Sequence, residues 1–114
     1  MATYTKVIPS ASTNGKPVII AVSGSPGTLF HTAVTGTSDL DEIWMYLTNI
    51  TDSDIVVTLE WGEAEDHIIG NAPSKSGLIL VAPGILLQNS LTVKAFADTV
   101  SGVYLHGFVN RIEA

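Results

Sequence analysis

Acidic side chains are the residues of this chain whose type and spacing could best support chemistry. Nine of the eleven aspartates and glutamates fall between Asp39 and Asp66. If residues 42–50 and 55–61 pair as a β-hairpin, six carboxylates gather at one end of it: Asp39, Asp41, Glu42, Glu63, Glu65 and Asp66. Converging carboxylates could bind Ca²⁺ or Mg²⁺, because hard cations prefer oxygen ligands. They could also act as the acid–base pair of a glycosidase.

The spacing of these carboxylates matches no known site. No EF-hand loop surrounds them, and a glycosidase would need Glu42 and Glu63 to work as a pair. We therefore expect a solvated acidic rim, with no catalytic residue, no cofactor and no metal. Binding of Ca²⁺ by the residues between Asp39 and Asp66 stays an open alternative.

Histidines and serines show no catalytic or metal-binding motif either. His31, His67 and His106 lie far apart and lack the spacing of a metal-binding HExxH helix, so we expect structural or surface roles. No serine sits in a GxSxG elbow. The glycines at positions 24 and 27 lack the lysine of a phosphate-binding loop. The sequence therefore predicts a protein that is not an enzyme.

The two strands that would position the acidic rim form the strongest pattern in the sequence. Residues 42–50 and 55–61 are rich in β-branched and aromatic residues and flank a polar turn at residues 51–54. If Ile50 faces Ile55, one side of the hairpin carries Trp44, Tyr46, Thr48, Val57, Leu59 and Trp61. We expect this side to be core, with its aromatic residues as an alternative contact surface.

The rest of the sequence alternates short apolar runs with turn signals. Strands are predicted at residues 17–22, 28–34, 78–82, 91–97 and 103–112, and residues 1–8 form an N-terminal arm or a first strand. The run at 78–82 is typical of a strand buried on both faces that ends before Pro83. The pattern predicts an all-β fold: a single-domain antiparallel β-sandwich over residues 1–114, of jelly-roll or immunoglobulin-like topology.

Composition limits the possible partners and locations. The chain is 46% hydrophobic and 14% charged, which is too apolar for a disordered protein and suggests buried contacts between copies. A net charge of −6 with scattered lysines argues against nucleic-acid binding. No apolar run is long enough for a membrane-spanning helix or a signal-peptide core. The absence of cysteine excludes disulfides and thiolate metal sites.

Three segments of the chain resemble small head proteins of tailed bacteriophages, especially marine and cyanobacterial ones. They are TYTKVIPSASTNGKPVIIA (residues 3–21), DEIWMYLTNITDSDIVVTLEWG (41–62) and GVYLHGFVNRIEA (102–114). The chain is similar to capsid decoration (cement) proteins, which are encoded near the major capsid protein. The resemblance implies a non-enzymatic β-sandwich that is made in the host bacterial cytoplasm. It also implies binding to the major capsid protein on the outer capsid surface of the virion, and assembly with itself as a dimer or trimer.

Two other kinds of role stay open at this point. Head–tail connectors and fibre-base domains are small virion proteins of similar sequence style. A carbohydrate-binding β-sandwich module would present Trp44 and Trp61 as an exposed stacking platform, with the acidic rim holding Ca²⁺.

Six residues are expected to contact partner proteins: Tyr4, Lys6, Ile43, Met45, Leu47 and Arg111. The first two and the last lie in the terminal segments, which are the freest to reach neighbouring subunits. The three between positions 43 and 47 lie on the second face of the predicted hairpin. Because that face is half apolar, another subunit is expected to cover it.

Overall fold

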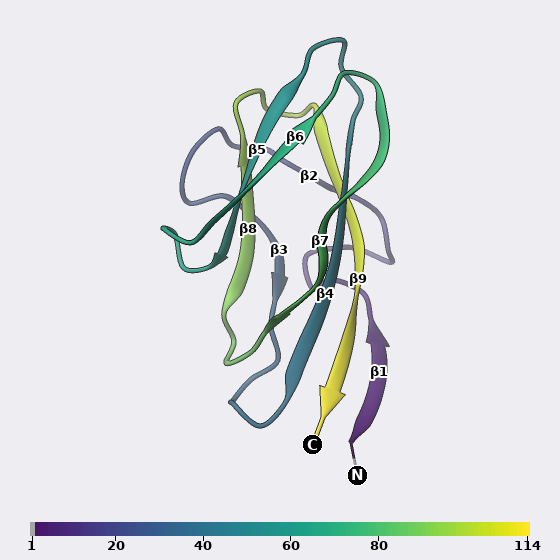
Figure 1. Cartoon of the computed structure of the whole chain (residues 1–114), viewed down its shortest axis with the longest axis vertical. Coiled ribbons are helices and arrows are strands. Elements are labelled where there is room, and N and C mark those ends of the chain that lie inside the picture. The colour runs from purple at the N-terminus through teal and green to yellow at the C-terminus, as the bar shows by residue number, and fades with distance from the viewer. Residues whose placement is uncertain (1) are drawn as a thin grey trace.

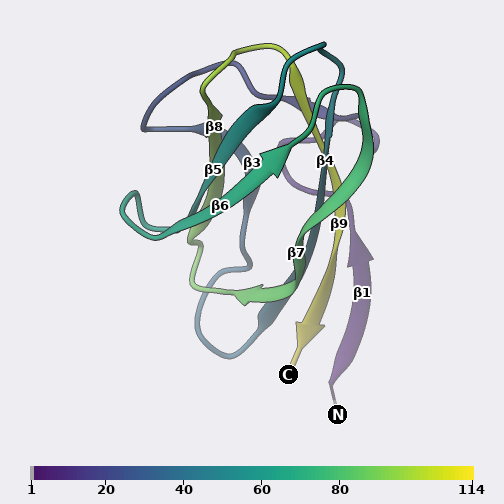
Figure 2. The ribbon, with the colours of Figure 1, turned by 45° about the horizontal axis from the view of Figure 1, so that its top comes forward.

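Residues 2–114, which the computed structural model describes, form nine strands in two antiparallel sheets (Figures 1 and 2). The strands are β1 (Thr3–Val7), β2 (Val18–Ile19), β3 (Thr28–Thr32), β4 (Leu40–Asn49), β5 (Ile55–Gly62), β6 (His67–Ala72), β7 (Ser76–Leu87), β8 (Thr92–Ala97) and β9 (Val103–Glu113). Sheet A has the order β1-β9-β4-β7, with the short β2 also paired to β9, and sheet B has the order β3-β8-β5-β6. The sheets pack face to face, which confirms the predicted all-β sandwich. Over this part of the chain no helix has the length and hydropathy to cross a membrane.

The strand pairing is that of a jelly roll. With the short β2 set aside, the first strand pairs with the last (β1 with β9) and the second with the seventh (β3 with β8). The third pairs with the sixth (β4 with β7) and the fourth with the fifth (β5 with β6). These are the pairs that one long antiparallel hairpin makes when it folds over into two sheets. Of the two predicted topologies, the jelly roll is therefore correct and the immunoglobulin-like one is wrong.

The predicted hairpin of residues 42–61 does not exist. Both of its strands are present as β4 and β5, but β4 lies in sheet A and β5 in sheet B (Figure 1). Residues 50–54 form a corner between the sheets, which Asn49 fixes. The side-chain amide of Asn49 donates to the carbonyl groups of Ser53 and Ala72 at 2.8 Å each. Its side-chain oxygen accepts the N–H of Thr51 at 2.9 Å.

β4 alternates strictly between the core and the outer face of sheet A. The odd-numbered residues from 41 to 49 are buried, and the even-numbered ones are half-buried on the outer face. Ile43, Met45 and Leu47 are 0% exposed, so the prediction that they contact a partner is wrong. The reason is that β4 pairs with β7 and β9 and not with β5, which turns these side chains toward sheet B. There they join Val57 and Leu59, which are buried as predicted.

β7 is an edge strand and not the doubly buried strand predicted at residues 78–82. It runs from Ser76 to Leu87 and passes through Pro83, where the prediction ended it. Because it forms one edge of sheet A, its Leu78 and Leu80 are 61% and 43% exposed. Proline is tolerated in such a strand because an edge has backbone N–H groups that face solvent.

The two ends of the chain lie side by side at one end of the sandwich (Figure 1). β1 pairs with β9 from Thr3 opposite Glu113 to Val7 opposite Val109. Residues 1–8 therefore contain a first strand and not a free arm, apart from Met1, which lies outside the described residues.

Residues 18–22 bridge the two sheets along one side of the sandwich. The N–H of Ile20 donates at 3.0 Å to the carbonyl of Val103 in β9, a strand of sheet A. Two residues later, the carbonyl of Val22 accepts at 3.2 Å the N–H of Ala97 in β8, a strand of sheet B. Ile20 is fully buried between these bonds and closes the core at this side.

Candidate functional site

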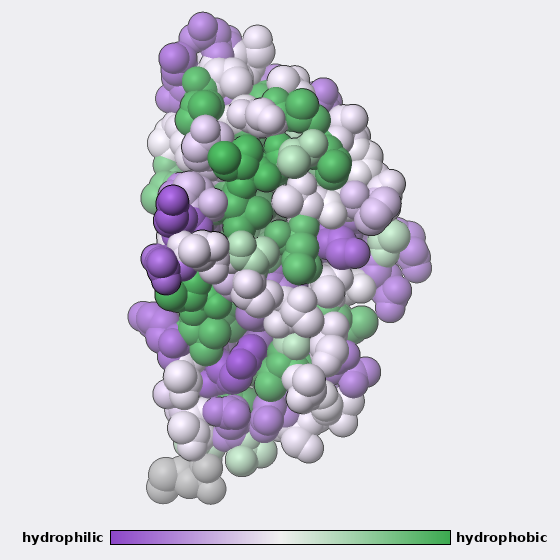
Figure 3. Space-filling view, turned by 180° about the vertical axis from the view of Figure 1, so that it is seen from behind, coloured by the Kyte–Doolittle hydropathy of each residue, from purple (hydrophilic) through white to green (hydrophobic). Residues whose placement is uncertain are grey.

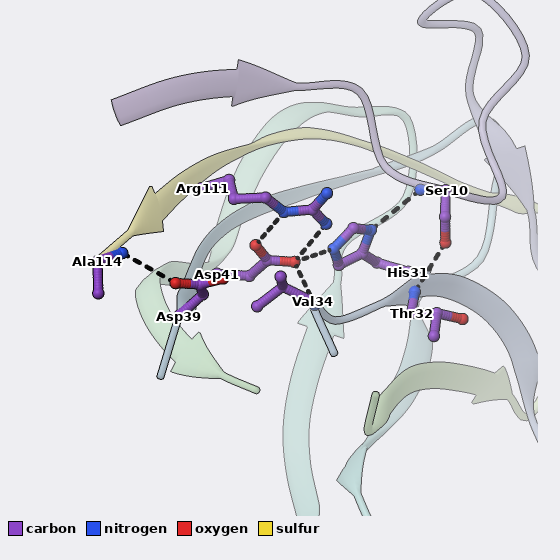
Figure 4. A network of polar contacts seen from close by, with 8 residues as sticks. All are labelled: Ser10, His31, Thr32, Val34, Asp39, Asp41, Arg111 and Ala114. Carbon is purple, nitrogen blue, oxygen red and sulfur yellow. Dashed lines mark hydrogen bonds and ion pairs between the residues drawn. The ribbon is translucent and has the colours of Figure 1, made fainter. Parts of the chain in front are cut away.

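Asp41 is the centre of a buried polar network at one end of the sandwich (Figure 4). It is 0% exposed and belongs to the inward-facing set of β4 residues. Arg111 of β9 donates to it with two nitrogens, Nε to Oδ1 at 2.8 Å and Nη2 to Oδ2 at 3.0 Å. Oδ2 also accepts the N–H of Val34 at 3.0 Å and a bond from His31 at 2.7 Å. The carboxylate is therefore paired with an arginine in bidentate geometry and satisfied by two further donors.

His31 reaches Asp41 from β3 in the opposite sheet. Its ring is 1% exposed, and its Nδ1 accepts the backbone N–H of Ser10 at 3.0 Å. Because Nδ1 is an acceptor, the proton of the neutral ring sits on Nε2, which donates to Asp41. The hydroxyl of Ser10 is engaged elsewhere, since its Oγ accepts the N–H of Thr32 at 2.7 Å. The three side chains therefore do not form a Ser-His-Asp triad.

Burial and hydrogen bonding fix the charge of each member. Burial lowers the pKa of His31. The hydrogen bond to Asp41 and the negative charge of Asp41 raise this pKa, but by less than burial lowers it, and the charge of Arg111 lowers it further. Burial raises the pKa of Asp41, but the hydrogen bonds from Arg111 and His31 outweigh it, so that pKa lies below its ordinary value. The network thus holds a neutral imidazole beside an ionised aspartate–arginine pair.

The network ties together segments that are far apart in sequence. It joins β3 of sheet B to β4 and β9 of sheet A, and to the loop at Ser10. Among the described residues, no buried side-chain nitrogen or oxygen lacks a hydrogen-bond partner. This is a structural site, in agreement with the structural role predicted for His31. The side chains of Asp41 and His31 are enclosed and offer no surface to a substrate.

The low pKa of His31 makes the stability of the fold depend on pH. In the unfolded chain His31 takes up a proton as the pH falls through about 6.5, while the folded chain resists it. The unfolded state therefore binds more protons in this window, and the free energy of unfolding should decrease with acidification below about pH 6.5. The slope from this one group is at most about 1.4 kcal/mol per pH unit. Denaturant unfolding at several pH values between 5 and 7.5 would measure it.

Two variants separate His31 from the other titrating groups. His31→Gln should flatten the pH dependence between pH 5 and 6.5, whatever it does to the stability at pH 7. His67→Gln, which changes an exposed histidine, should keep the slope of the parent chain. Equal slopes for the parent and His31→Gln would contradict this assignment.

The predicted acidic rim is divided among separate environments. Because β4 and β5 lie in different sheets, Glu42 does not face Glu63, and Asp41 is inside the core. Glu42 accepts bonds from the indole Nε1 of Trp44 at 2.7 Å and the amide of Asn110 at 2.9 Å, and both bonds lower its pKa. Across residues 2–114, no group of three or more histidines, aspartates and glutamates is placed to hold a metal ion.

Glu60 is a second buried carboxylate, on the outer face of sheet B. The loop before β3 covers it: the hydroxyl of Ser25 and the N–H of Gly27 donate to its two oxygens. Burial raises the pKa of Glu60, and the bonds from Ser25 and Gly27 outweigh that effect and lower it. This carboxylate fastens a loop to β5 and is therefore another structural site.

The outer face of sheet A gathers five of the eight aromatic residues: Tyr4, Trp44, Tyr46, Tyr104 and Phe108. We call this set the aromatic face. The rings of Trp44 and Phe108, which are cross-strand partners on β4 and β9, stack with centroids 6.0 Å apart and an interplanar angle of 9°. The ammonium group of Lys6 lies 4.8 Å from the centroid of the Phe108 ring. Tyr4 is 72% exposed, and the other four are half-buried.

The residues predicted to contact partners divide into three groups. Tyr4 and Lys6 are exposed on β1 at the margin of the aromatic face. Arg111 is half-buried and held by Asp41, so its first role is in the core network. Ile43, Met45 and Leu47 are core, as described above. Sequence reasoning missed the aromatic face, because its members come from three strands whose order in the sheet was not predicted.

The two tryptophans do not form the predicted cluster. Trp44 lies on sheet A, whereas Trp61 lies on β5 of sheet B and donates its indole N–H to the carbonyl of Leu86 at 3.4 Å. Seen from behind, the surface carries several separate hydrophobic groups with polar side chains between them (Figure 3). Within the described part of the chain, the surface has no pocket.

Comparison of the chain with protein-family models, with curated proteins and with solved structures finds no match.

Proposed function

We propose that this chain is a decoration protein of a tailed-bacteriophage capsid and binds the major capsid protein on the outer surface of the virion. The observation that carries the proposal is the aromatic face, a broad sheet surface on which tyrosine, tryptophan and phenylalanine side chains are partly exposed. Such residues contribute most of the binding energy in protein interfaces. The resemblance of residues 3–21, 41–62 and 102–114 to decoration proteins supplies the identity of the partner.

Charge and fold agree with an outer position. A net charge of −6 suits the outside of a shell better than the inside, where the phosphates of packaged DNA would repel it. Jelly rolls are common in viral capsid proteins and also in lectins. The fold is therefore compatible with the proposal, and the choice between these roles rests on the surface.

The carbohydrate-binding alternative depended on a pair of neighbouring tryptophans that the fold does not contain. It required Trp44 and Trp61 side by side as a stacking platform, and these residues lie on different sheets. Trp44 is also already stacked on Phe108, so one side of its indole is occupied. Connector and fibre-base roles make no such demand on the tryptophans, and the binding experiment below distinguishes them.

A pelleting experiment tests the proposal. Purified protein is mixed with expanded heads that lack it, and separately with unassembled major capsid protein. A decoration protein should bind the heads and ignore the free subunits, because its site is completed where capsid subunits meet and its affinity sums many modest contacts. Equal binding to both samples would contradict the proposal. Binding to neither by the folded protein would favour a connector or fibre-base role.

A pair of matched substitutions tests whether the contact lies on sheet A. Leu80 is 43% exposed and pairs with Tyr46 at the aromatic face, whereas Ile69 is 61% exposed on the outer face of sheet B. Leu80→Glu should weaken binding to heads by about tenfold or more, because a carboxylate would be buried in an apolar contact. Ile69→Glu should leave binding unchanged. The reverse result would move the contact to sheet B.

A further inference from the structure

Sheet edges are where a β-sandwich can add a strand from another chain, and three of the four edges here have a feature that disfavours this addition. The edge strands are β1 and β7 in sheet A and β3 and β6 in sheet B. β7 has three register shifts against β4 and contains Pro83, and both features hinder strand addition. β3 has a bulge, and its edge is covered because Ala11 donates to the carbonyl of Phe30 at 3.1 Å. β6 pairs with β5 in unbroken register, but it contains Gly70, and a glycine inside a strand weakens its pairing.

β1 has none of these protections. Its five residues, Thr3–Val7, pair with β9 in unbroken register, and the strand contains neither proline nor glycine. Four of the five residues are exposed. Both ribbon views show β1 as the outermost strand on its side, with no other segment beyond it (Figures 1 and 2).

Hydrogen bonds of β9 reveal which backbone groups of β1 point outward. In β9 the carbonyl of Val103 accepts from Ile20, on the side of the strand that faces β2 and β1. The carbonyl of Gly102, the preceding residue, accepts from Ile50 on the side that faces β4. Backbone direction alternates along a strand, and the register of β9 with β4 has no shift, so the odd-numbered residues of β9 point toward β1.

The partners of those odd-numbered residues are Thr3, Thr5 and Val7, which therefore use their N–H and C=O groups in the ladder with β9. The N–H and C=O groups of Tyr4 and Lys6 point the other way, away from the sheet. Among the hydrogen bonds of residues 2–114, none outside the strand ladders involves these four groups. They form an open edge, which we define as the outward backbone groups of Tyr4 and Lys6.

We propose that the open edge binds the open edge of a second copy of this chain, with the two β1 strands antiparallel about a two-fold axis. Only residues with outward groups can exchange hydrogen bonds, which limits the register. Pairing Tyr4 with Lys6 of the partner copy overlaps all of Thr3–Val7 and makes four backbone hydrogen bonds. Pairing Lys6 with itself would set like charges opposite each other and shorten the overlap.

Side chains favour the same register. It places the Lys6 ammonium of each copy beside the Tyr4 ring of the other, where a cation–π contact is favourable. Thr5 lies opposite Thr5, and Thr3 lies opposite Val7, which are β-branched cross-strand pairs. The strand is therefore complementary to itself in both charge and shape.

Pairing about this axis has a consequence for the aromatic face. A two-fold axis perpendicular to the sheet leaves the outer faces of both copies on the same side, so the two aromatic faces become one continuous surface. The inference rests on the geometry of β1 alone and would hold for an oligomer with any function. If the capsid proposal is also correct, the dimer would present two contacts at once, which raises the avidity.

Sedimentation of a proline variant tests the open edge in buffer, without any capsid component. Lys6→Pro removes an outward N–H, so it should break the contact between copies and spare the ladder with β9. We expect the dimer dissociation constant to rise by about tenfold or more, because two hydrogen bonds are lost across the two-fold axis. Lys6→Arg keeps both the N–H and the positive charge beside Tyr4, so its constant should stay within a few-fold of the parent. A parent chain that remains monomeric at millimolar concentration, or equal constants for the parent and Lys6→Pro, overturns the inference.

Cross-linking tests the register in a chain that has no cysteine of its own. Thr5→Cys should form a disulfide-linked dimer under mild oxidation, since facing residues of this kind have Cα atoms about 4.5 Å apart. Thr3→Cys is the matched control: its two copies would lie about 14 Å apart along the strands, too far for a disulfide. A Thr5→Cys variant that links no faster than Thr3→Cys overturns the inference, even if the protein dimerises by another surface.

Discussion

Replacing Asp41 by alanine is expected to lower the free energy of unfolding by about 3–5 kcal/mol, the range for removing one partner of a buried ion pair. The side chain is fully buried and accepts bonds from Arg111, His31 and the N–H of Val34. Without it, the arginine loses its counter-charge, and an enclosed imidazole N–H loses its acceptor. Urea denaturation of the variant and the parent chain at pH 7.5 would measure the difference.

A charge-matched control separates this effect from the loss of one acidic residue. Glu65→Ala removes an exposed carboxylate from the turn after β5 and should change the stability by no more than about 0.5 kcal/mol. A double-mutant cycle of Asp41→Ala with Arg111→Ala should give a coupling energy above about 0.5 kcal/mol. A loss below about 1 kcal/mol in Asp41→Ala would mean that the network relaxes without cost.

Leu59→Ala should cost about 2–5 kcal/mol, the range for large-to-small changes in a packed core. Leu59 is 0% exposed on β5, between Ile68 of β6 and Ala95 of β8 in sheet B, and faces the core residues of β4. Truncation would leave a cavity because neighbouring strands on both sides prevent collapse. The same denaturation assay would measure it.

Val56→Ala on the same strand is the control for Leu59→Ala. Val56 is 42% exposed on the outer face of sheet B, so its truncation should cost well under the Leu59 value. Similar losses in the two variants would mean that strand propensity, and not core packing, sets the cost. A loss near zero in Leu59→Ala would mean that β5 is turned the other way.

The positions of most strands could be predicted from the sequence, apart from β6 and the full length of β7, whereas strand partners could not. The alternation in residues 91–97 and 103–112 predicts β8 and β9 almost to their observed ends, because a sheet with one buried face imposes a period of two. In β4 both sets of alternate residues are apolar: Ile43, Met45 and Leu47 in one, Trp44 and Tyr46 in the other. Composition therefore could not decide which set faces inward, and the assumed pairing with β5 decided it wrongly.

The corner at residues 50–54 explains that error. A short polar segment between two strands suits a hairpin turn and also a corner from one sheet to the other. What selects the corner is remote in sequence: Asn49 donates to the carbonyl of Ala72, and Ile50 donates to the carbonyl of Gly102. No pattern in the sequence near residues 49–54 predicts these hydrogen bonds.

One feature of the sequence could have predicted part of the buried network. Asp41 stands two residues before Ile43 and is in phase with Met45 and Leu47. If that set faces inward, a carboxylate at its start must be paired, because an isolated buried charge is too costly. Its partners His31 and Arg111 are 10 and 70 residues away, and the order of the strands was needed to bring them together.

The central position of β9 in sheet A has a consequence for how the protein is made. β9 hydrogen-bonds to β1, β2 and β4, yet it is the last of these strands to leave the ribosome. At a synthesis rate of roughly 5–20 residues per second, several seconds pass between the synthesis of β1 and that of β9. Sheet B needs nothing beyond Ala97 and can assemble earlier. Until β9 is synthesised, β4 has β7 as its one available neighbour in sheet A, and the nascent chain should bind chaperones during this interval.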